Sequence, residues 1–591
     1  NHLKLFILTP NKAVCIVLVV FTAAIHATDI TYKVISLVPN GETVAVIVNN
    51  HIYPLRNANS NSSLLHFGEA PAPDNGDYKY VIIENENNQI VESENFTRTI
   101  SDGTTSTPND YYGRSWNYFD LPEMPDILPS LPIIHRIQSK LHIHNEIPTI
   151  HFYGDQSLVD MIHQNQKADI DIHLNMTYIS PNDVVHFPNV TVALSGHSTR
   201  GLSKVSYSFK TPTDDYLYGY RQIKLRSMSM DSSYMRDYMS YGVAKAIGQP
   251  SSEYSYARLY INDRAIGLFG VAEAFKAPWI RNEFANGDAN FEHGALYTAD
   301  IFGGKELFGA LEDGDGRPKG PPDGEMQPLD SPAELSYLGS NVSFYSAGQY
   351  DVKEDPSSGF PNYTRIMEVS KFISEQPTIP LENDSTVSLW EKEIDVVSFL
   401  RGLALEIILS DTDGYLTMGN NYILYNDLVH QRLVFSGQDF DLTMGTMFYN
   451  ASKMLSGNYS DYPGFYKRPV PPALMAVPHF KQEFENLLIN ITTELVNNKV
   501  LGNVIRGVYN MIEQDVAWDQ SLPRVASDIL PGAIENINSS LSNDAEQMFR
   551  GVSFQTAVFG PSVSNYTMSL LDWLSIRSNN ILAFFNQPLI E

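Results

Sequence analysis

Cysteine, basic residues and long apolar runs are all scarce in this chain. Its 591 residues include one cysteine, Cys15, which excludes an intramolecular disulfide framework and a zinc site built on several thiolates. Lysine and arginine number 40 against 68 aspartates and glutamates, and the formal net charge is -28 at pH 7. This balance argues against binding to nucleic acid or to an anionic membrane through the general surface.

What the chain does contain is typical of a folded globular protein. Hydrophobic residues make up 43% and aromatic residues 11%, a composition that is too apolar for a disordered chain. Because 591 residues are too many for a single core, we expect two or three domains.

A secretory signal peptide is predicted over residues 1–27. Lys12 precedes an apolar run from Ala13 to Ile25, and the small residue Ala27 marks the expected cleavage site. The alternative is a membrane anchor, which is weaker because the run is shorter than the ~20 residues that a membrane-spanning helix requires. The mature chain is therefore expected to carry no membrane span.

Asparagines in N-x-S/T sequons are spread along the chain. They include Asn61, Asn95, Asn175, Asn189, Asn341, Asn362, Asn383, Asn450, Asn458, Asn490, Asn538 and Asn565. Sequons of this kind are glycosylated on the surface loops of secreted proteins. Together with the signal peptide they predict a glycoprotein that passes through the secretory pathway to the extracellular space or to the cell or spore surface.

Three regions are predicted after the signal peptide. Residues 28–100 hold short β-rich segments between turn residues, which predicts a small all-β sandwich of immunoglobulin-like or carbohydrate-binding-module-like type. Residues 101–146 mix Thr, Ser, Pro and aromatics, as expected of an extended connector packed by its aromatics. Residues 147–591 form a larger α+β domain, with a Gly-, Pro- and acid-rich insertion at 303–335 that we interpret as a solvated loop where a partner-binding surface could arise.

The most informative segment is DTDGYLTMGNNYILYNDLVHQRLVFSGQDFDLTMG, residues 411–445. It places Asp413, Asn421, Asp439 and Asp441 around two short β-branched and aromatic stretches, which predict a hairpin whose turn opens at 426–427. Because a hairpin brings the start of its first strand beside the end of its second, Asn421 and Asp439 should lie together. Carboxylate and amide oxygens suit Mg²⁺, with phosphate and water completing its shell. We therefore predict a divalent-cation site for phosphate chemistry.

These residues resemble the signature of the CotH family of spore-coat protein kinases, an atypical kinase-like group. The resemblance implies a two-lobed, protein-kinase-like domain that uses ATP with Mg²⁺ or Mn²⁺. It also implies that Asp413 is the catalytic carboxylate, that Asn421 and Asp439 are metal ligands, and that Asp441 joins this metal site where kinases have glycine.

Further matches to the family precede this segment. Arg200-Gly201 and Lys204-Val205-Ser206-Tyr207 resemble an R-G and K-x-S-Y pattern, which implies that Lys204 binds phosphate, with Lys224 as the second choice. The loop SGHSTRG around Arg200 contains small residues that let backbone N–H groups approach a phosphate, although most such loops are only turns.

The intervening sequence predicts a strand and a helix over 222–248, capped by Asp231 or Ser232, and then a hairpin turning at Asn262-Asp263. Glu273 ends this hairpin and matches an acidic position of the family. Its implied role is to orient a lysine or the metal, and the alternative is a solvated edge carboxylate. An antiparallel sheet and one long helix are expected for this lobe.

Two functions stay open from sequence alone. The first is a secreted or cell-surface protein kinase that transfers phosphate from ATP to Ser/Thr hydroxyls of a Ser-rich coat or secretory protein. The second is a non-catalytic adhesin or invasin that binds a host-cell receptor, because the whole chain also resembles the CotH-like surface proteins of mucoralean fungi, some of which are invasins.

Overall fold

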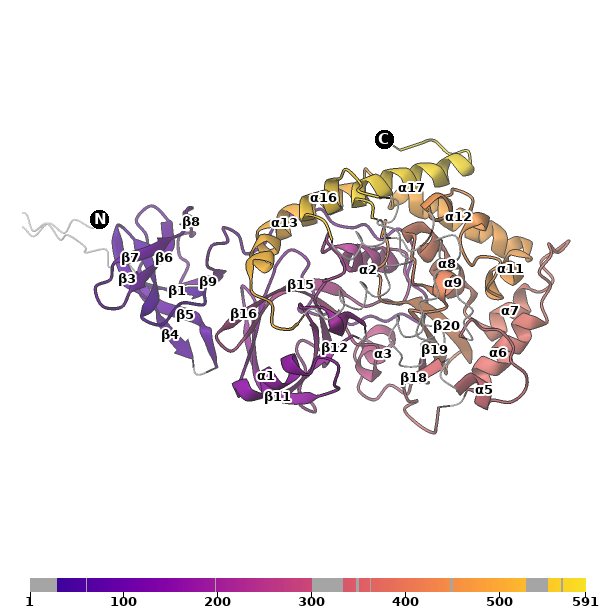
Figure 1. Cartoon of the computed structure of the whole chain (residues 1–591), viewed down its shortest axis with the longest axis horizontal. Helices are drawn as coiled ribbons and strands as arrows, with labels where there is room; N and C mark the ends of the chain where they lie inside the picture. Colours follow the sequence, from indigo (N-terminus) through magenta and orange to yellow (C-terminus); the bar gives the residue numbers. More distant parts are fainter. Residues whose placement is uncertain are drawn as a thin grey trace, which may run out of the picture.

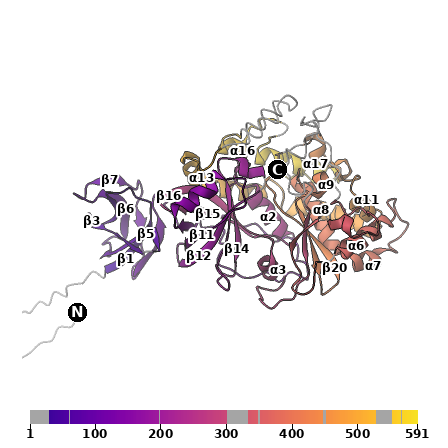
Figure 2. The same cartoon turned by 60° about the horizontal axis from the view of Figure 1, so that its bottom comes forward.

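The structure is a computed structural model that describes residues 29–59, 61–196, 198–299, 333–346, 350–361, 363–446, 449, 451–527, 551–564 and 567–590. Figures 1 and 2 show two N-terminal β-sheets at one end of the molecule, a β-barrel in the middle and a helix-rich part at the other end. The predicted signal peptide, residues 303–332 of the insertion, and the sequons at 362, 450, 538 and 565 lie outside the described residues.

The N-terminal region is a sandwich of two sheets around one core. One sheet holds β4 (Arg56–Asn59), β5 (Ser62–Pro71), β1 (Asp29–Ile35) and β9 (Ser106–Tyr111), and the other holds β3 (His51–Pro54), β2 (Glu42–Val48), β6 (Asp77–Glu84), β7 (Ile90–Ser93) and β8 (Arg98–Thr99). Alternate residues such as Tyr32, Val46 and Tyr80 point into the shared core. Strand β9 pairs in parallel with β1, so the sandwich extends into the range predicted to be connector.

Polar contacts join the sandwich to the larger domain. The Tyr111 and Tyr260 hydroxyls are 2.6 Å apart, and Ser62 Oγ lies 2.9 Å from His151 Nδ1. The stretch from 112 to 148 contains no helix or strand, and its Leu131 is buried in the core of the larger domain. This stretch is packed onto the domain that it leads into.

A closed barrel forms the middle of the molecule. Its order is β10 (Thr149–Tyr153), β11 (Asp171–Ile179), β12 (Val184–Ser195), β13 (Ser206–Lys210), β14 (Gln222–Arg226), β16 (Arg264–Glu273) and β15 (Tyr254–Ile261). The sequence predicted an antiparallel sheet here. The parallel pairing of β10 with β15 closes that sheet, and Phe152, Tyr207 and Phe269 fill the interior.

Helix α2 (Arg236–Ala246) packs against β15, and α1 (Gln156–Gln164) lies beside β11. The predicted cap of α2 is wrong, because the helix begins after Met235, and Asp231 instead accepts hydrogen bonds from Ser233 N and Arg236 N. The hairpin of β15 and β16 turns at 262–263 as predicted.

The remainder is a small sheet covered by helices. The sheet order is β18 (Tyr350–Glu354), β17 (Leu296–Ala299), β19 (Tyr422–Asp427) and β20 (Arg432–Gly437). The described helices are α3 (Ala277–Phe284), α5 (Ser343–Ser346), α6 (Thr364–Ser374), α7 (Val387–Glu393), α8 (Val396–Leu409), α9 (Tyr415–Met418), α10 (Ala451–Met454), α11 (Val470–Met475), α12 (Pro478–Glu494), α13 (Leu501–Ser521), α16 (Phe554–Phe559) and α17 (Leu570–Phe584). The fold is therefore mixed α and β, and none of its described helices is long and apolar enough to cross a membrane.

Helix α13 connects the helix-rich part to the barrel. It lies across the top of the molecule in Figure 1 and packs on β16. Its Asp519 is fully buried and bonds barrel residues, including Leu268 N at 3.0 Å. The two parts thus share one continuous packed unit around the segment 411–445.

Candidate functional site

The end of α8 positions Asp413. Ser410 adopts a left-handed conformation with φ 54° and ends the helix, so the chain turns at 411–414. Asp411 Oδ1 accepts a hydrogen bond from Asp413 N at 2.9 Å, and the Glu406 carboxylate accepts from Tyr415 N at 3.0 Å. Both acids are buried, and their hydrogen bonds to backbone N–H groups fix the conformation of this loop.

The predicted hairpin is confirmed as β19 and β20. Tyr422 pairs with Gly437, and Gln438 N donates to Asn421 O at 2.8 Å, which brings Asn421 and Asp439 to the same end of the hairpin. The turn lies one step beyond its predicted opening, because Asp427 is still the last residue of β19.

Asn421 also meets the loop that follows α8. Its Nδ2 donates to Asp413 Oδ2 at 2.7 Å, so any cation here would be bound through the amide oxygen. Asn421 and Asp439 have positive φ angles of 48° and 58°, a conformation that Asn and Asp adopt more readily than other residues. Such backbone strain is concentrated at functional sites.

Three carboxylates of this region influence one another electrostatically. Burial and the Asp439 carboxylate raise the pKa of Asp413 to about 7. Burial and Asp439 also raise the pKa of Asp441 well above its ordinary value. Like charges disfavour ionisation of their neighbours, so the structure brings together the four residues Asp413, Asn421, Asp439 and Asp441 from three chain segments.

Strand β14 faces these acids with two cations. Lys224 and Arg226 alternate with Ile223 and Leu225, which fill the barrel interior, so the two basic side chains share the outer face. The Arg226 guanidinium lies on both carboxylate oxygens of Asp439, with Nη1 3.1 Å from Oδ2.

Helix α2 fixes the same group from its other side. Asp237 accepts from Arg226 Nε at 3.1 Å and from Phe440 N at 3.0 Å. One turn later, Asp439 N donates to the Tyr241 hydroxyl at 3.0 Å. The helix therefore contacts the backbone that carries Asp439 as well as the cation that binds it.

Lys224 is held in the field of the acids. Burial and the nearby Lys353 lower its pKa to about 8, while Asp439 opposes that change. A lysine with a lowered pKa beside a carboxylate cluster is typical of a functional site.

Among its described contacts, the side chain of Lys204 does not reach Asp413, Asp439 or Asp441. Its Nζ lies 2.7 Å from Asp519 Oδ1 on α13 and donates to Leu268 O at 2.7 Å. Burial lowers its pKa to about 8 although Asp519 favours the charged form. Lys204 thus joins α13 to the barrel, and Lys224, the second choice from the sequence, is the lysine at the predicted metal site.

Arg200 and Glu273 also lie apart from the acids. Arg200 binds Asp169 Oδ1 at 2.7 Å and Leu194 O at 3.0 Å. Glu273 pairs across the sheet with Ile223, on the face opposite Lys224, where it accepts from Asn282 Nδ2 at 3.3 Å. Burial and Glu283 raise the pKa of Glu273, so it is a buried carboxyl and not the solvated edge residue considered from the sequence.

The loop around Arg200 still reaches the site through a neighbour. Thr199 lines a small cavity of about 20 Å³ together with Arg226, Asp237 and Asp441. That volume suffices for about one water molecule, so the predicted phosphate loop borders the acidic site although Arg200 itself turns away.

Arg226 and Asp237 are functional candidates to which the sequence assigned no role. In the sequence Arg226 lies two residues after Lys224, and Asp237 follows Arg236 directly, so which acid pairs with which basic residue could not be determined from the sequence. The usable signal was the alternation of Lys224 and Arg226 along one strand, which places both on one face.

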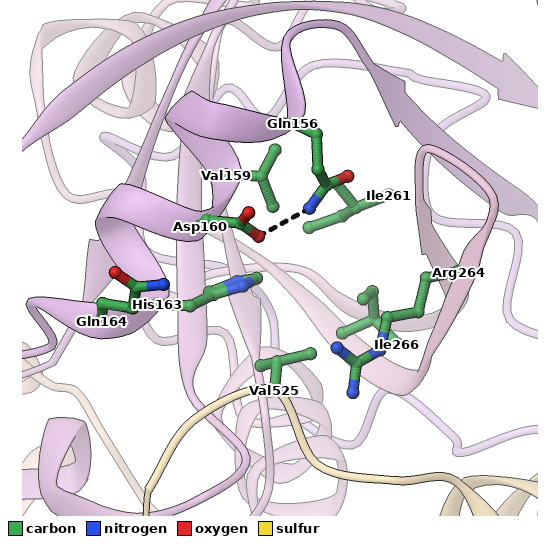
Figure 3. Close-up of a pocket in the computed structure, with 9 residues that line it drawn as sticks. All are labelled: Gln156, Val159, Asp160, His163, Gln164, Ile261, Arg264, Ile266 and Val525. Atoms are coloured by element: carbon green, nitrogen blue, oxygen red, sulfur yellow. Dashed lines mark hydrogen bonds between the residues drawn. The ribbon is translucent and has the colours of Figure 1, made fainter.

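A second cavity near α1 offers less for this chemistry. Figure 3 shows its walls, in which Gln156 bonds Asp160 at 2.8 Å and Arg264 lies opposite His163. Its volume is about 130 Å³ and its lining includes one carboxylate. Burial and Arg264 lower the pKa of His163 to about 4, so His163 is neutral at pH 7. With a single carboxylate and the Arg264 cation in its lining, this cavity is a poor match for a divalent cation.

The acid cluster fits a magnesium ion that is shared with phosphate. Among the described residues no three His, Cys, Asp or Glu side chains form a metal cage of their own. Mg²⁺ commonly takes only one or two carboxylates from protein and completes its shell with water and phosphate. The donor set of Asn421 and Asp439, with Asp441 adjacent, has that chemistry.

Comparison with known proteins shows the family of this chain. The family model described as CotH kinase protein matches residues 192–524, more than half of the chain, and the match spans the acids and β14. The chain belongs to the CotH family.

Relatives of this CotH protein match it over almost its whole length. It is 25% identical to Invasin CotH3 of Rhizopus delemar over 577 residues, covering 96% of this chain and 86% of the relative. It is 23% identical to Spore coat protein homolog 1 of the same organism, covering 97% and 85%. Invasin CotH2 is 25% identical, with coverage of 84% and 77%. The matched range includes the N-terminal sandwich as well as the larger domain, and the names of these relatives point to a surface or extracellular location.

Proposed function

We propose that this CotH protein is a secreted or cell-surface atypical protein kinase that transfers the terminal phosphoryl group of ATP to Ser/Thr hydroxyls of a protein substrate. The observation that carries the proposal is the convergence of Asp413, Asn421 and Asp439 with Lys224 and Arg226. Acids from the helix-rich part thus meet cations from the barrel, as expected of a two-lobed kinase-like domain in which the barrel is the first lobe.

Each residue has a role that follows from its surroundings. Asp413, whose pKa is about 7, is suited to accept the proton of the attacking hydroxyl at neutral pH. Lys224 lies where it can hold the phosphates through its charge, and Asn421 and Asp439 would hold Mg²⁺ or Mn²⁺. When bound, the metal offsets charge on the phosphates during transfer.

The acceptor of the phosphoryl group is proposed to be an exported protein. Because relatives are named as spore coat proteins and the predicted route is secretory, we propose a Ser-rich coat or secretory protein, or the chain itself. The net charge of -28 favours an exported acceptor that carries basic residues near its hydroxyls.

A transfer assay with labelled ATP and Mn²⁺ tests the proposal. Wild-type protein should label itself or a Ser-rich acceptor, and Asp439→Ala should lower the rate by about 100-fold or more. Asp169→Ala is the matched control, since Asp169 is an acid that is 92% exposed and pairs only with the remote Arg200 among its described contacts. Equal rates in wild type and Asp439→Ala would refute the proposal.

A second function is favoured by the names of two of the reported relatives. Invasin CotH3 matches 96% of this chain, so we propose host-cell receptor binding as the alternative, which needs no intact acid cluster. Beads coated with Asp439→Ala protein should then attach to host cells as well as wild-type beads do. Loss of attachment in this variant would tie binding to the acid cluster and count against an independent adhesin.

A further inference from the structure

Arg226 contacts three acids of the site at once. Its Nε lies 3.1 Å from Asp237, its Nη1 3.1 Å from Asp439 Oδ2, and its Nη2 3.3 Å from Asp441 Oδ2. The guanidinium fork thus contacts three carboxylates that come from two parts of the chain, α2 and the segment after β20.

This arrangement leaves few ligands for a second metal ion. Both oxygens of Asp439 are bonded to Arg226, and Asp237 and Asp441 share the same guanidinium. Kinases of the ordinary type use two Mg²⁺ ions to offset the phosphate charge. Here a permanent cation that cannot be deprotonated occupies the side of Asp439 that faces Asp237 and Asp441.

The end of the hairpin that carries both Asn421 and Asp439 remains suited to one ion. Asn421 Nδ2 donates to Asp413 Oδ2 at 2.7 Å, which leaves its amide oxygen, together with the Asp439 carboxylate, as the protein ligands that one Mg²⁺ requires. Lys224 adds a second positive charge near Asp439.

We infer that Arg226 is a positioning residue that stands in for a second metal ion, so that this site takes a single divalent cation, held by Asn421 and Asp439. The inference rests on the proposed function, because it specifies how many divalent cations the proposed site binds. It concerns stoichiometry, which can be measured without turnover.

The experiment counts Mn²⁺ ions bound to the full chain by electron paramagnetic resonance, in the presence of a non-hydrolysable ATP analogue. Wild type should bind one ion per chain, and Arg226→Gln should bind two because Asp439 and Asp441 become available. Arg226→Lys keeps a charge but cannot contact three carboxylates at once, so its second ion should appear only at about tenfold higher Mn²⁺ than in Arg226→Gln. Arg221→Gln is the matched control. Arg221 directly precedes β14 and donates to Pro212 O, so this variant should bind one ion, as wild type does.

The outcomes separate the two claims. Two ions in wild type, or one ion or none in a folded Arg226→Gln, would overturn the inference while nucleotide binding still stood. If Arg226→Gln does not fold, Arg226→Lys decides, and a single ion at every Mn²⁺ concentration overturns the inference. If wild type binds neither the analogue nor Mn²⁺, the proposed function itself fails.

Discussion

Lys204 and Lys224 are two buried lysines at the barrel with the same lowered pKa and different surroundings. Burial lowers both pKa values to about 8. Lys204 faces the single acid Asp519. Lys204 also donates to Leu268 O, and Asp519 also accepts from the Tyr234 hydroxyl. Lys224 faces acids in excess, together with the further cations Arg226 and Lys353.

The comparison shows that a perturbed pKa alone does not mark a site. The closed cluster in which Asp519 contacts Lys204, Arg524 and Tyr234 is a structural feature, and removing Lys204 leaves a buried acid with fewer partners. An unbalanced cluster of carboxylates and cations has capacity left for an added cation and for phosphate. The predictions that follow test this distinction.

Lys204→Met should have the largest effect on stability. It leaves Asp519 buried with only Tyr234, Leu268 N and Arg524 as its described partners. We expect the free energy of unfolding to fall by about 3 kcal/mol, measured by urea denaturation. Transfer activity per folded molecule should stay near that of wild type, and a loss of activity without destabilisation would reverse the roles of the two lysines.

Lys224→Met should have the opposite profile. Without the ammonium group near Asp439, phosphate is held poorly, and the transfer rate should fall about 100-fold, which corresponds to about 2.7 kcal/mol. The midpoint of urea unfolding should change little, because Lys224 has no single acid partner of its own among its described contacts. A destabilisation as large as that of Lys204→Met would show that both lysines are structural.

The pH profile of transfer should be bell-shaped around neutrality. The rate rises as Asp413 loses its proton near pH 7 and falls as Lys224 loses its charge near pH 8. We expect a change of about tenfold per pH unit on each side, measured as kcat/KM, which reports the pKa values of the free enzyme. A flat profile between about pH 6 and pH 9 would remove Asp413 from its role as base.

Asp413→Asn should abolish transfer and yet stabilise the fold slightly at high pH. Because burial raises the pKa of Asp413 in the folded state, the folded protein bears the cost of its ionised form above about pH 7 but not near pH 4. Removing the charge should raise the free energy of unfolding by on the order of 1 kcal/mol at pH 8, with a much smaller gain at pH 5. Equal effects at both pH values would contradict the assigned pKa.

The local parts of this site could be predicted from sequence. The β-branched and aromatic stretches of 422–425 and 433–435 determine a hairpin, and a hairpin alone brings Asn421 to Asp439. The segment before Asp411 is apolar with helical periodicity, so α8 could also be predicted from sequence.

The non-local parts could not be predicted. Choosing between Lys204 and Lys224 required knowing that α13, some 300 residues later, supplies Asp519 to the first of them. The parallel pairings of β9 with β1 and of β10 with β15 likewise join distant segments, and they have no local sequence signal. Arg226 was visible only as one basic residue among several until the strand and the helix were placed together.

The most direct test of the acid cluster is a thermal-shift titration of the full chain with ATP and Mg²⁺. Ligand that binds the folded state must raise its apparent stability, so the midpoint of unfolding should rise when both are present at millimolar concentration, and neither alone should give the full shift. The shift should vanish in Asp439→Ala and persist in Asp169→Ala. No shift in wild type, or an equal shift in Asp439→Ala, would contradict a metal and nucleotide site at Asp413, Asn421 and Asp439.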